Sequence, residues 1–180
     1  MSLKHVGPGD KTPDEINVVV EIPANTGPVK YEVDKETGAV FVDRFMATAM
    51  FYPCNYGYVP DSLADDGDPL DVMVVTPHPL IAGTVITCRP IGVLEMEDEA
   101  GDDAKIVAVP ISKVARIYDA VQSAADLPEG LVHTIEHFFA HYKDLERGKW
   151  VNVRGWGDAD AARAYVDKAI ARVQPGETIG

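Results

Sequence analysis

Apolar and polar residues alternate in short runs over the first two-thirds of the chain, a pattern typical of β-strands. Residues 18–22 are mostly valine and isoleucine and stop at a proline. Residues 30–34 alternate, so that their polar side chains share one face of a strand. With a turn at 35–38 and an apolar run at 39–42, they predict a β-hairpin. Further strands are predicted over residues 70–75, 83–88, 91–96 and 105–109.

The last third has a period of three to four residues, which indicates helices. Asp126, Pro128 and Glu129 supply helix-start chemistry, and the predicted helix then presents Leu131, Val132, Ile135, Phe138, Phe139, Tyr142 and Leu145. A second helix is expected to begin near Asp158, to end before Pro175-Gly176, and to carry inward Ala162, Tyr165, Val166, Ala169 and Ile170. Strands followed by helices predict an α+β fold with a closed or strongly curved sheet and helices outside it.

No linker, repeat or low-complexity segment interrupts the sequence, so we expect one domain over residues 1–180. No apolar run approaches the roughly 20 residues of a membrane span, and the first residues do not resemble a signal peptide. Cys54 and Cys88 lack metal-ligand spacing. They are expected to be reduced core thiols, which favours a cytoplasmic location without membrane association.

The formal net charge is −13, which argues against a nucleic-acid surface, because such a surface needs a basic stripe. It also looks unsuited to a polyanionic substrate. Bound metal ions resolve this conflict, since they invert the local charge wherever carboxylates gather.

An acidic loop, Asp66-Gly67-Asp68-Pro69-Leu70-Asp71, carries the clearest chemistry. In extended backbone Asp66 and Asp68 point to the same side, and Asp71 enters an apolar strand that would hold its carboxylate firmly. Ligands that are all oxygen suit hard cations such as Mg²⁺ or Mn²⁺. An isolated Asp-Gly-Asp is about as often a solvated turn, but the third carboxylate favours a metal site.

A second acidic cluster spans residues 97–105. Alone it is more often a charged hairpin tip, but with the first cluster it predicts a shared site for two or more metal ions. Dispersed cations, Lys30, Arg44, Lys105 and Lys143, could hold phosphate. The sequence has no Gly-x-x-x-x-Gly-Lys-Ser/Thr loop, which argues against a P-loop nucleotide enzyme.

Seven segments in order resemble the soluble family I inorganic pyrophosphatases of bacteria. The resemblance extends from about Asn17 to Trp156 and rests on Glu21-Ile22-Pro23, Lys30-Tyr31-Glu32, Val42 to Phe45, Tyr52 to Tyr58, Asp66 to Asp71, Asp98 to Lys105 and His141-Tyr142-Lys143. It implies an OB-like, five-stranded closed β-barrel with flanking α-helices. It also implies hydrolysis of pyrophosphate to two orthophosphates with several Mg²⁺ ions, for which Mn²⁺ or Zn²⁺ could substitute.

The resemblance further implies a role for each matching residue. Asp68 corresponds to the general base, and Tyr56 to a supporting group. Metal ligands are implied at Asp66, Asp71, Asp98, Asp103, Glu21 and Glu32, and substrate-binding groups at Lys30, Arg44, Lys105, Tyr142 and Lys143. The expected nucleophile is a water bridging two metal ions, from which Asp68 accepts or steers a proton.

Three other functions fit parts of the sequence. A Ca²⁺ module of the EF-hand type fails because the sixth and twelfth positions counted from Asp66 are Asp71 and Pro77, where glycine and glutamate are needed. An OB-type nucleic-acid module conflicts with the net charge. A Mg²⁺-dependent nucleotide phosphohydrolase stays open, although the sequence has no feature for base recognition.

His133, His137 and His141 are spaced four apart and so share one face of the predicted helix. A zinc site is disfavoured because a third ligand type and a His-Glu-x-x-His motif are missing. The plain alternative is an exposed polar stripe. Because similar bacterial enzymes form hexamers, we expect a homohexamer in which His137, His141 and Asp144 pair across subunits.

Overall fold

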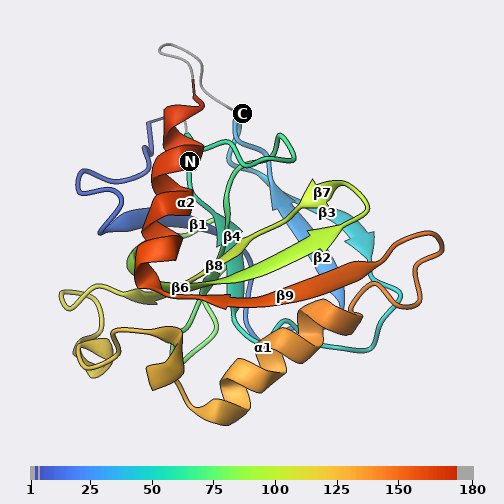
Figure 1. The fold of residues 1–180 in the computed structure, drawn as a ribbon. Helices are drawn as coiled ribbons and strands as arrows, with labels where there is room; N and C mark the ends of the chain where they lie inside the picture. Colours follow the sequence, from blue (N-terminus) through green and yellow to red (C-terminus); the bar gives the residue numbers. More distant parts are fainter. Residues whose placement is uncertain (1–2, 4, 174–180) are drawn as a thin grey trace.

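The computed structural model describes residue 3 and residues 5–173 (Figure 1). Its strands are β1 (Ile16–Ile22), β2 (Val29–Val33), β3 (Val40–Phe45), β4 (Asn55–Tyr58), β5 (Asp71–Val74), β6 (Val85–Asp98), β7 (Gly101–Asp102), β8 (Lys105–Pro110) and β9 (Val151–Gly157). The helices are α1 (Glu129–His141) and α2 (Ala159–Ala171), with short 3-10 turns at Arg116–Tyr118 and Ala124–Asp126. The predicted stop at Pro175-Gly176 lies outside the described residues.

Five strands close into a ring. Strand β1 pairs with both β4 and β6, β4 pairs with β5, β5 runs parallel to β8, and β8 returns to β6. Helices α1 and α2 lie outside the ring (Figure 1). The prediction of an α+β fold with a closed five-stranded sheet and flanking helices is therefore confirmed.

The two helices cover two separate apolar clusters. Helix α1 buries Ile135, Phe138 and Phe139 against the cluster that contains Tyr52 and Tyr56. Helix α2 buries Ala162, Val166 and Ala169 against the cluster that contains Leu70, Val72 and Ile106. Asp158 caps α2 by accepting a hydrogen bond from the amide of Ala161, which confirms the predicted start of this helix.

The structure corrects the predicted helix around residues 131–145. Helix α1 ends at His141, and Leu145 is 73% exposed instead of facing the core. The reason is local, because successive turns follow the helix, with the Asp144 amide donating to the His141 carbonyl and the Glu146 amide donating to the Lys143 carbonyl.

The strands also differ from the prediction in three places. Strand β9 interrupts the C-terminal third, which the periodicity assigned to helices, and it pairs with β6. Strand β4, fully buried, was not predicted. The two strands expected at 83–88 and 91–96 are one long strand, β6, which bends at an irregularity between Pro90 and Gly92 where it pairs with β8.

Gly57 permits a close approach between β4 and β1. A Cβ atom at this position would lie 1.9 Å from the carbonyl oxygen of Val19 in β1. Only glycine fits there, and its neighbours Tyr56 and Tyr58 are thereby held at fixed positions in β4.

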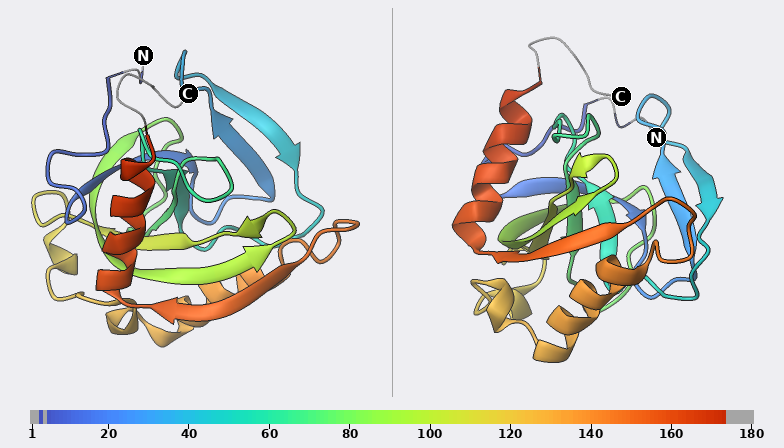
Figure 2. Two further views of the ribbon diagram at one scale, coloured as in Figure 1. Left: turned by 45° about the horizontal axis from the view of Figure 1, so that its top comes forward. Right: turned by 45° about the vertical axis from the view of Figure 1, so that its right-hand side comes forward.

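The hairpin of β2 and β3 is confirmed and forms a separate two-stranded sheet beside the ring (Figure 2). Glu21 joins the two sheets, because its carboxylate in β1 accepts a hydrogen bond of 2.9 Å from the amide of Val33 in β2. The space between ring and hairpin therefore has an acidic group at its base.

Cys54 and Cys88 are buried free thiols, as predicted. Burial raises the pKa of Cys54 to about 12, so this thiol is inert at neutral pH. Within residues 5–173, neither helix has the length and hydrophobicity needed to cross a membrane.

Candidate active site

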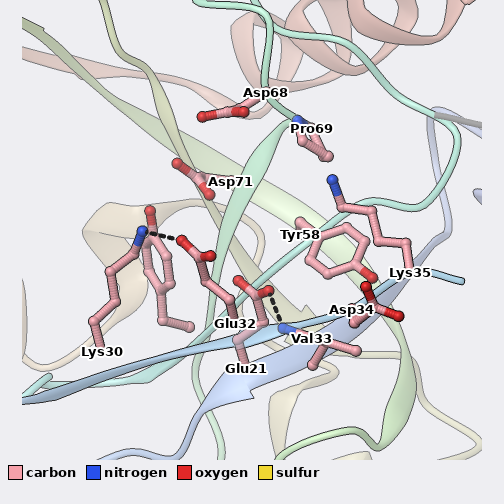
Figure 3. A pocket seen from close by; sticks show the side chains of 11 residues that line it. Glu21, Lys30, Glu32, Val33, Asp34, Lys35, Tyr58, Asp68, Pro69 and Asp71 are labelled. Carbon is pink, nitrogen blue, oxygen red and sulfur yellow. Dashed lines mark hydrogen bonds and ion pairs between the residues drawn. The ribbon is translucent and has the colours of Figure 1, made fainter. Parts of the chain in front are cut away.

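A cavity of about 310 Å³ lies between the hairpin and the ring (Figure 3). Asp68 and Asp71 lie on one side of it, and Glu32 and Lys30 face them from the hairpin. Six predicted site residues line the cavity: Glu21, Lys30, Glu32, Tyr56, Asp68 and Asp71. The remaining lining residues are Val33, Asp34, Lys35, Tyr58 and Pro69.

The acidic loop is held near its C-terminal end by two hydrogen bonds of Leu70. The amide of Val59 donates to the carbonyl of Leu70 over 2.9 Å, and the buried hydroxyl of Ser62 accepts from the amide of Leu70 over 2.9 Å. Within the loop, the carboxylate of Asp66 accepts from the amide of Asp68 over 3.0 Å. The exposed tip of the loop therefore has a defined shape.

The second acidic segment meets the first because β5 and β8 are parallel neighbours. Val72 lies opposite Ile106 in the register, so Asp71 and Lys105 begin adjacent strands side by side. Asp98 ends β6, and Asp103 lies between β7 and β8, so both carboxylates come shortly before β8 in the chain. The predicted convergence of the two acidic clusters thus follows from strand order.

Lys105 stands at the centre of this convergence and is 4% exposed. Its ammonium group pairs with the carboxylate of Asp71 and, at 2.5 Å, with that of Asp103. It also lies 5.5 Å from the ring centre of Tyr56. Although burial alone would lower the pKa of Lys105, the neighbouring carboxylates raise it well above its usual value, so the group stays charged.

Burial raises the pKa of three carboxylates of the site, which disfavours their ionised form. Burial, the largest cause, raises the pKa of Glu21 to about 7. Burial, together with neighbouring acidic groups, also raises the pKa of Asp66 and Asp103. At Asp98 burial is outweighed by hydrogen bonds from Lys143 and the Ala100 amide, which lower its pKa.

The remaining cations come from three elements. Lys30 and Arg44 are register partners in the hairpin, where Lys30 contacts Glu32 at 2.6 Å. Lys143, just after α1, contacts Asp98 at 2.6 Å and is buried. Within the described part of the chain, the buried Nε of Arg44 has no hydrogen-bond partner, which leaves a donor that an anion could fill.

Seven predicted site residues lie outside the cavity lining of the described structure: Arg44, Asp66, Asp98, Asp103, Lys105, Tyr142 and Lys143. Lys105 connects Asp103 to the lining residue Asp71. Tyr142 is buried, and the ammonium group of Lys143 lies 5.6 Å from its ring centre.

Three polar lining residues were not predicted as site residues: Asp34, Lys35 and Tyr58. Two of them had a signal in the sequence. Asp34 shares a strand face with Lys30 and Glu32 by alternation, and Tyr58 lies two residues from Tyr56 in the same strand. Lys35 follows the strand in a turn, where alternation no longer applies.

A model of the family described as Inorganic pyrophosphatase matches residues 18–174. The chain belongs to the inorganic pyrophosphatase family. It is 61% identical to an inorganic pyrophosphatase of Yersinia pestis over 174 residues, which are 97% of this chain and 99% of the relative.

Two solved structures share the fold of this pyrophosphatase-family chain. A crystal structure of an inorganic phosphatase from Anaplasma phagocytophilum superposes with a TM-score of 0.91 at 47% identity, covering 94% of this chain and 99% of that one. The inorganic pyrophosphatase from Thermus thermophilus superposes with a TM-score of 0.89 at 44% identity, covering 97% of this chain and 100% of that one. The ring, hairpin and helices are therefore the architecture of a family of enzymes.

Membership of this family implies a divalent metal cofactor, and the carboxylate oxygens of the site are suitable ligands for one. In the described residues no three His, Cys, Asp or Glu side chains are grouped closely enough to enclose a metal ion. Mg²⁺ does not require such an enclosure, because it keeps several waters and uses one or two carboxylates together with substrate phosphates. Burial raises the pKa of Asp66 and Asp103, and at Asp103 it does so although the ammonium group of Lys105 lies 2.5 Å away. A bound divalent cation would therefore favour the ionised form of both carboxylates.

The helix-face histidines are not among the residues that line the cavity. The rings of His137 and His141 are 4.6 Å apart. The Nδ1 of His141 lies 2.8 Å from the carboxylate of Asp144 in the same chain, and both side chains are about half exposed. His133 is also exposed. The three residues proposed for pairing across subunits are therefore accessible on one surface.

Proposed function

We propose that this chain hydrolyses inorganic pyrophosphate to two orthophosphates with several bound Mg²⁺ ions, for which Mn²⁺ or Zn²⁺ can substitute. One observation carries the proposal. Lys105 ties Asp71 of the first acidic segment to Asp103 of the second, directly beside a cavity that also holds Asp68 and Lys30. Acidic and basic groups thus surround one space, as a metal-bound polyphosphate requires.

We assign the metal ligands to Asp66, Asp71, Asp98, Asp103, Glu21 and Glu32. When bound, divalent metal ions would neutralise the phosphate oxygens and lower the pKa of a bound water. The chain contributes position and charge: Lys30, Arg44, Lys143 and Tyr142 would bind phosphate oxygens, and Lys105 and Tyr56 would hold the surrounding groups. This division follows the general logic of phosphoryl transfer, in which positioning and electrostatics supply most of the catalysis.

We assign the general base to Asp68. Its side chain is exposed and reaches the cavity beside Asp71 (Figure 3). The water oxygen attacks one phosphorus atom, Asp68 accepts the proton of that water, and the bridging P–O bond breaks to release the second phosphate. Asp71, in contrast, is paired with Lys105, which suits a fixed ligand better than a proton acceptor.

The test is phosphate release from pyrophosphate and from ATP, each with Mg²⁺ or with EDTA. We expect release from pyrophosphate only when Mg²⁺ is present. Equal release from ATP would instead indicate the nucleotide phosphohydrolase, and no release from either would indicate a binding module without catalysis.

We further propose that residues 1–180 act as one catalytic domain in the cytoplasm and assemble into a homohexamer. Exposure of His137, His141 and Asp144 on one surface supports a contact there. No nucleic-acid or membrane partner is proposed, because the net charge of −13 disfavours polyanionic surfaces.

A further inference from the structure

The C-terminal part of helix α2 is fastened to the segment that leads into the acidic loop. The amide of Leu63 donates to the carbonyl of Ala169 over 2.9 Å. Arg172 donates to the carbonyl of Leu63 over 3.5 Å. These bonds join two segments more than 100 residues apart in the sequence, and none of the three residues lines the cavity.

Asp65 adds an ionic contact to this junction. Its carboxylate pairs with Lys168 at 2.9 Å and with the guanidinium group of Arg172. The Asp65 and Arg172 side chains are each about one-third exposed.

Asp65 immediately precedes Asp66, and two main-chain hydrogen bonds connect Ala64 with the loop. The amide of Ala64 donates to the carbonyl of Asp68 over 2.7 Å. The amide of Gly67 donates to the carbonyl of Ala64 over 3.3 Å, and Gly67 has a φ of +92°. Movement at residues 63–65 therefore moves both Asp66 and Asp68.

We propose that Lys168 and Arg172 are positioning residues for the acidic loop, acting through Asp65. The inference rests on the proposed function, because it concerns the same acidic loop. It assigns a role to helix α2, which carries none of the residues that we place in the active site. In this role the helix fixes the geometry of the loop before any metal ion arrives.

The sign of the effect separates positioning from simple electrostatics. Lys168 and Arg172 are cations near a metal site, so by charge alone their removal would strengthen metal binding, most clearly at low ionic strength. Loss of positioning weakens metal binding instead, because the ligands must then be ordered when the metal binds. A variant that lacks both cations thus gives opposite results for the two explanations.

The experiment measures Mn²⁺ binding to the protein without substrate, by the electron paramagnetic resonance signal of free Mn²⁺ at low ionic strength. The variant is Lys168→Met with Arg172→Met. Its matched control is Lys11→Met with Arg163→Met, which also removes two cations. Those cations pair with Glu15 and with Asp160 and Asp14, away from the loop.

We expect the Lys168/Arg172 variant to bind Mn²⁺ about tenfold more weakly, the low end of the loss seen when groups that support metal ligands are removed. The control should bind as tightly as the wild type or slightly more so. Arg172→Lys in the wild-type background keeps the charge and a donor and should bind as the wild type does. Unchanged or tighter binding by the Lys168/Arg172 variant would overturn the inference.

Measurements of activity and of folding distinguish a failure of the proposed function from a failure of this inference. Wild-type protein that releases no phosphate from pyrophosphate contradicts the proposed function, whatever the variants do. Should urea titration show that the double methionine variant does not fold, Lys168→Met alone, with Lys11→Met as its control, keeps the opposite signs of the two explanations. With an active wild type, the inference also predicts that added Mn²⁺ restores turnover in the variant, because the loss lies in metal affinity.

Discussion

Asp68 lies between two predicted metal ligands, so its role can be separated from theirs by one substitution. Asp68→Asn keeps the shape of the side chain but removes the proton acceptor. We expect Mn²⁺ affinity close to that of the wild type and a fall in turnover of about 100-fold or more, the usual contribution of a general base. Binding titration and phosphate release measure the two effects.

Asp66→Asn is the control for this prediction. It removes a proposed ligand from the same loop, so metal affinity should fall and excess metal should recover part of the turnover. If Asp68→Asn behaved in the same way as Asp66→Asn, Asp68 would be a further ligand and not the base.

Glu21 makes the metal-free protein sensitive to pH. Burial raises its pKa from 4.5 to about 7, so between these values the folded protein keeps a proton that the unfolded chain has released. The free energy of unfolding therefore decreases as the pH rises from 4.5 to 7. At ~1.4 kcal/mol for each pKa unit, the cost reaches at most about 3 kcal/mol above pH 7.

Glu21→Gln removes this cost. In EDTA we expect the variant to be more stable than the wild type at pH 8 and to lose that advantage near pH 4.5, as measured by urea denaturation. The same difference in stability at both pH values would contradict the assignment.

Most site residues could be predicted at this scale because they lie in short, distinctive motifs such as residues 66–71. Asp65 could not be singled out in this way, because its importance depends on Lys168 and Arg172, more than 100 residues away. Lys105 was placed among the cations of the site, but its contact with Asp71 requires the parallel pairing of β5 and β8.

At the scale of elements, Gly57 allows β1 and β4 to pair closely. Gly57→Ala places a methyl group 1.9 Å from the carbonyl oxygen of Val19, so the strands must separate. We expect a loss of about 3 kcal/mol or more in the free energy of unfolding, as for other severe overpacking in a core. Urea denaturation measures it.

Gly130 in α1 provides the matched control. A Cβ atom there has no neighbour within 4 Å, and alanine favours a helix by roughly 0.5–1 kcal/mol over glycine. Gly130→Ala should therefore be neutral or stabilising. If both variants were equally destabilised, the close approach at Gly57 would not be the cause.

Local sequence patterns predicted the elements whose hydrogen bonds join residues that are close in the sequence. The β2–β3 hairpin followed from alternation and a turn, and α2 followed from Asp158 and the apolar spacing after it. Strand β9 was missed although Val151 and Val153 alternate with polar residues, because the helical period on both sides dominated. The continuity of β6 across Pro90 depends on pairing with β8, which a local pattern does not contain.

At the scale of the whole molecule, closure of the ring joins β1 to β6, a contact between residues about 70 apart. The sequence predicted a closed or strongly curved sheet but left the choice between them to the family resemblance. The number of acidic groups was known from the composition. That the two acidic segments meet depends on the order of the strands in the sheet.

Assembly should depend on the exposed histidine pair of α1. The rings of His137 and His141 are 4.6 Å apart, and Asp144 pairs with His141 at 2.8 Å. We therefore expect His137→Ala with His141→Ala to dissociate in part in sedimentation velocity under conditions where the wild type is a hexamer, whereas identical hexamers of both proteins would contradict this contact.

The ion pairs of Lys105 have a consequence for a cell that runs short of the divalent metal ion. A metal ion leaves when its concentration falls, but the ammonium group of Lys105 is part of the chain and stays between Asp71 and Asp103. The centre of the site therefore never holds only negative charge, even in newly made protein. Metal-free enzyme should therefore stay folded. It should regain activity when the metal ion returns, without synthesis of new protein.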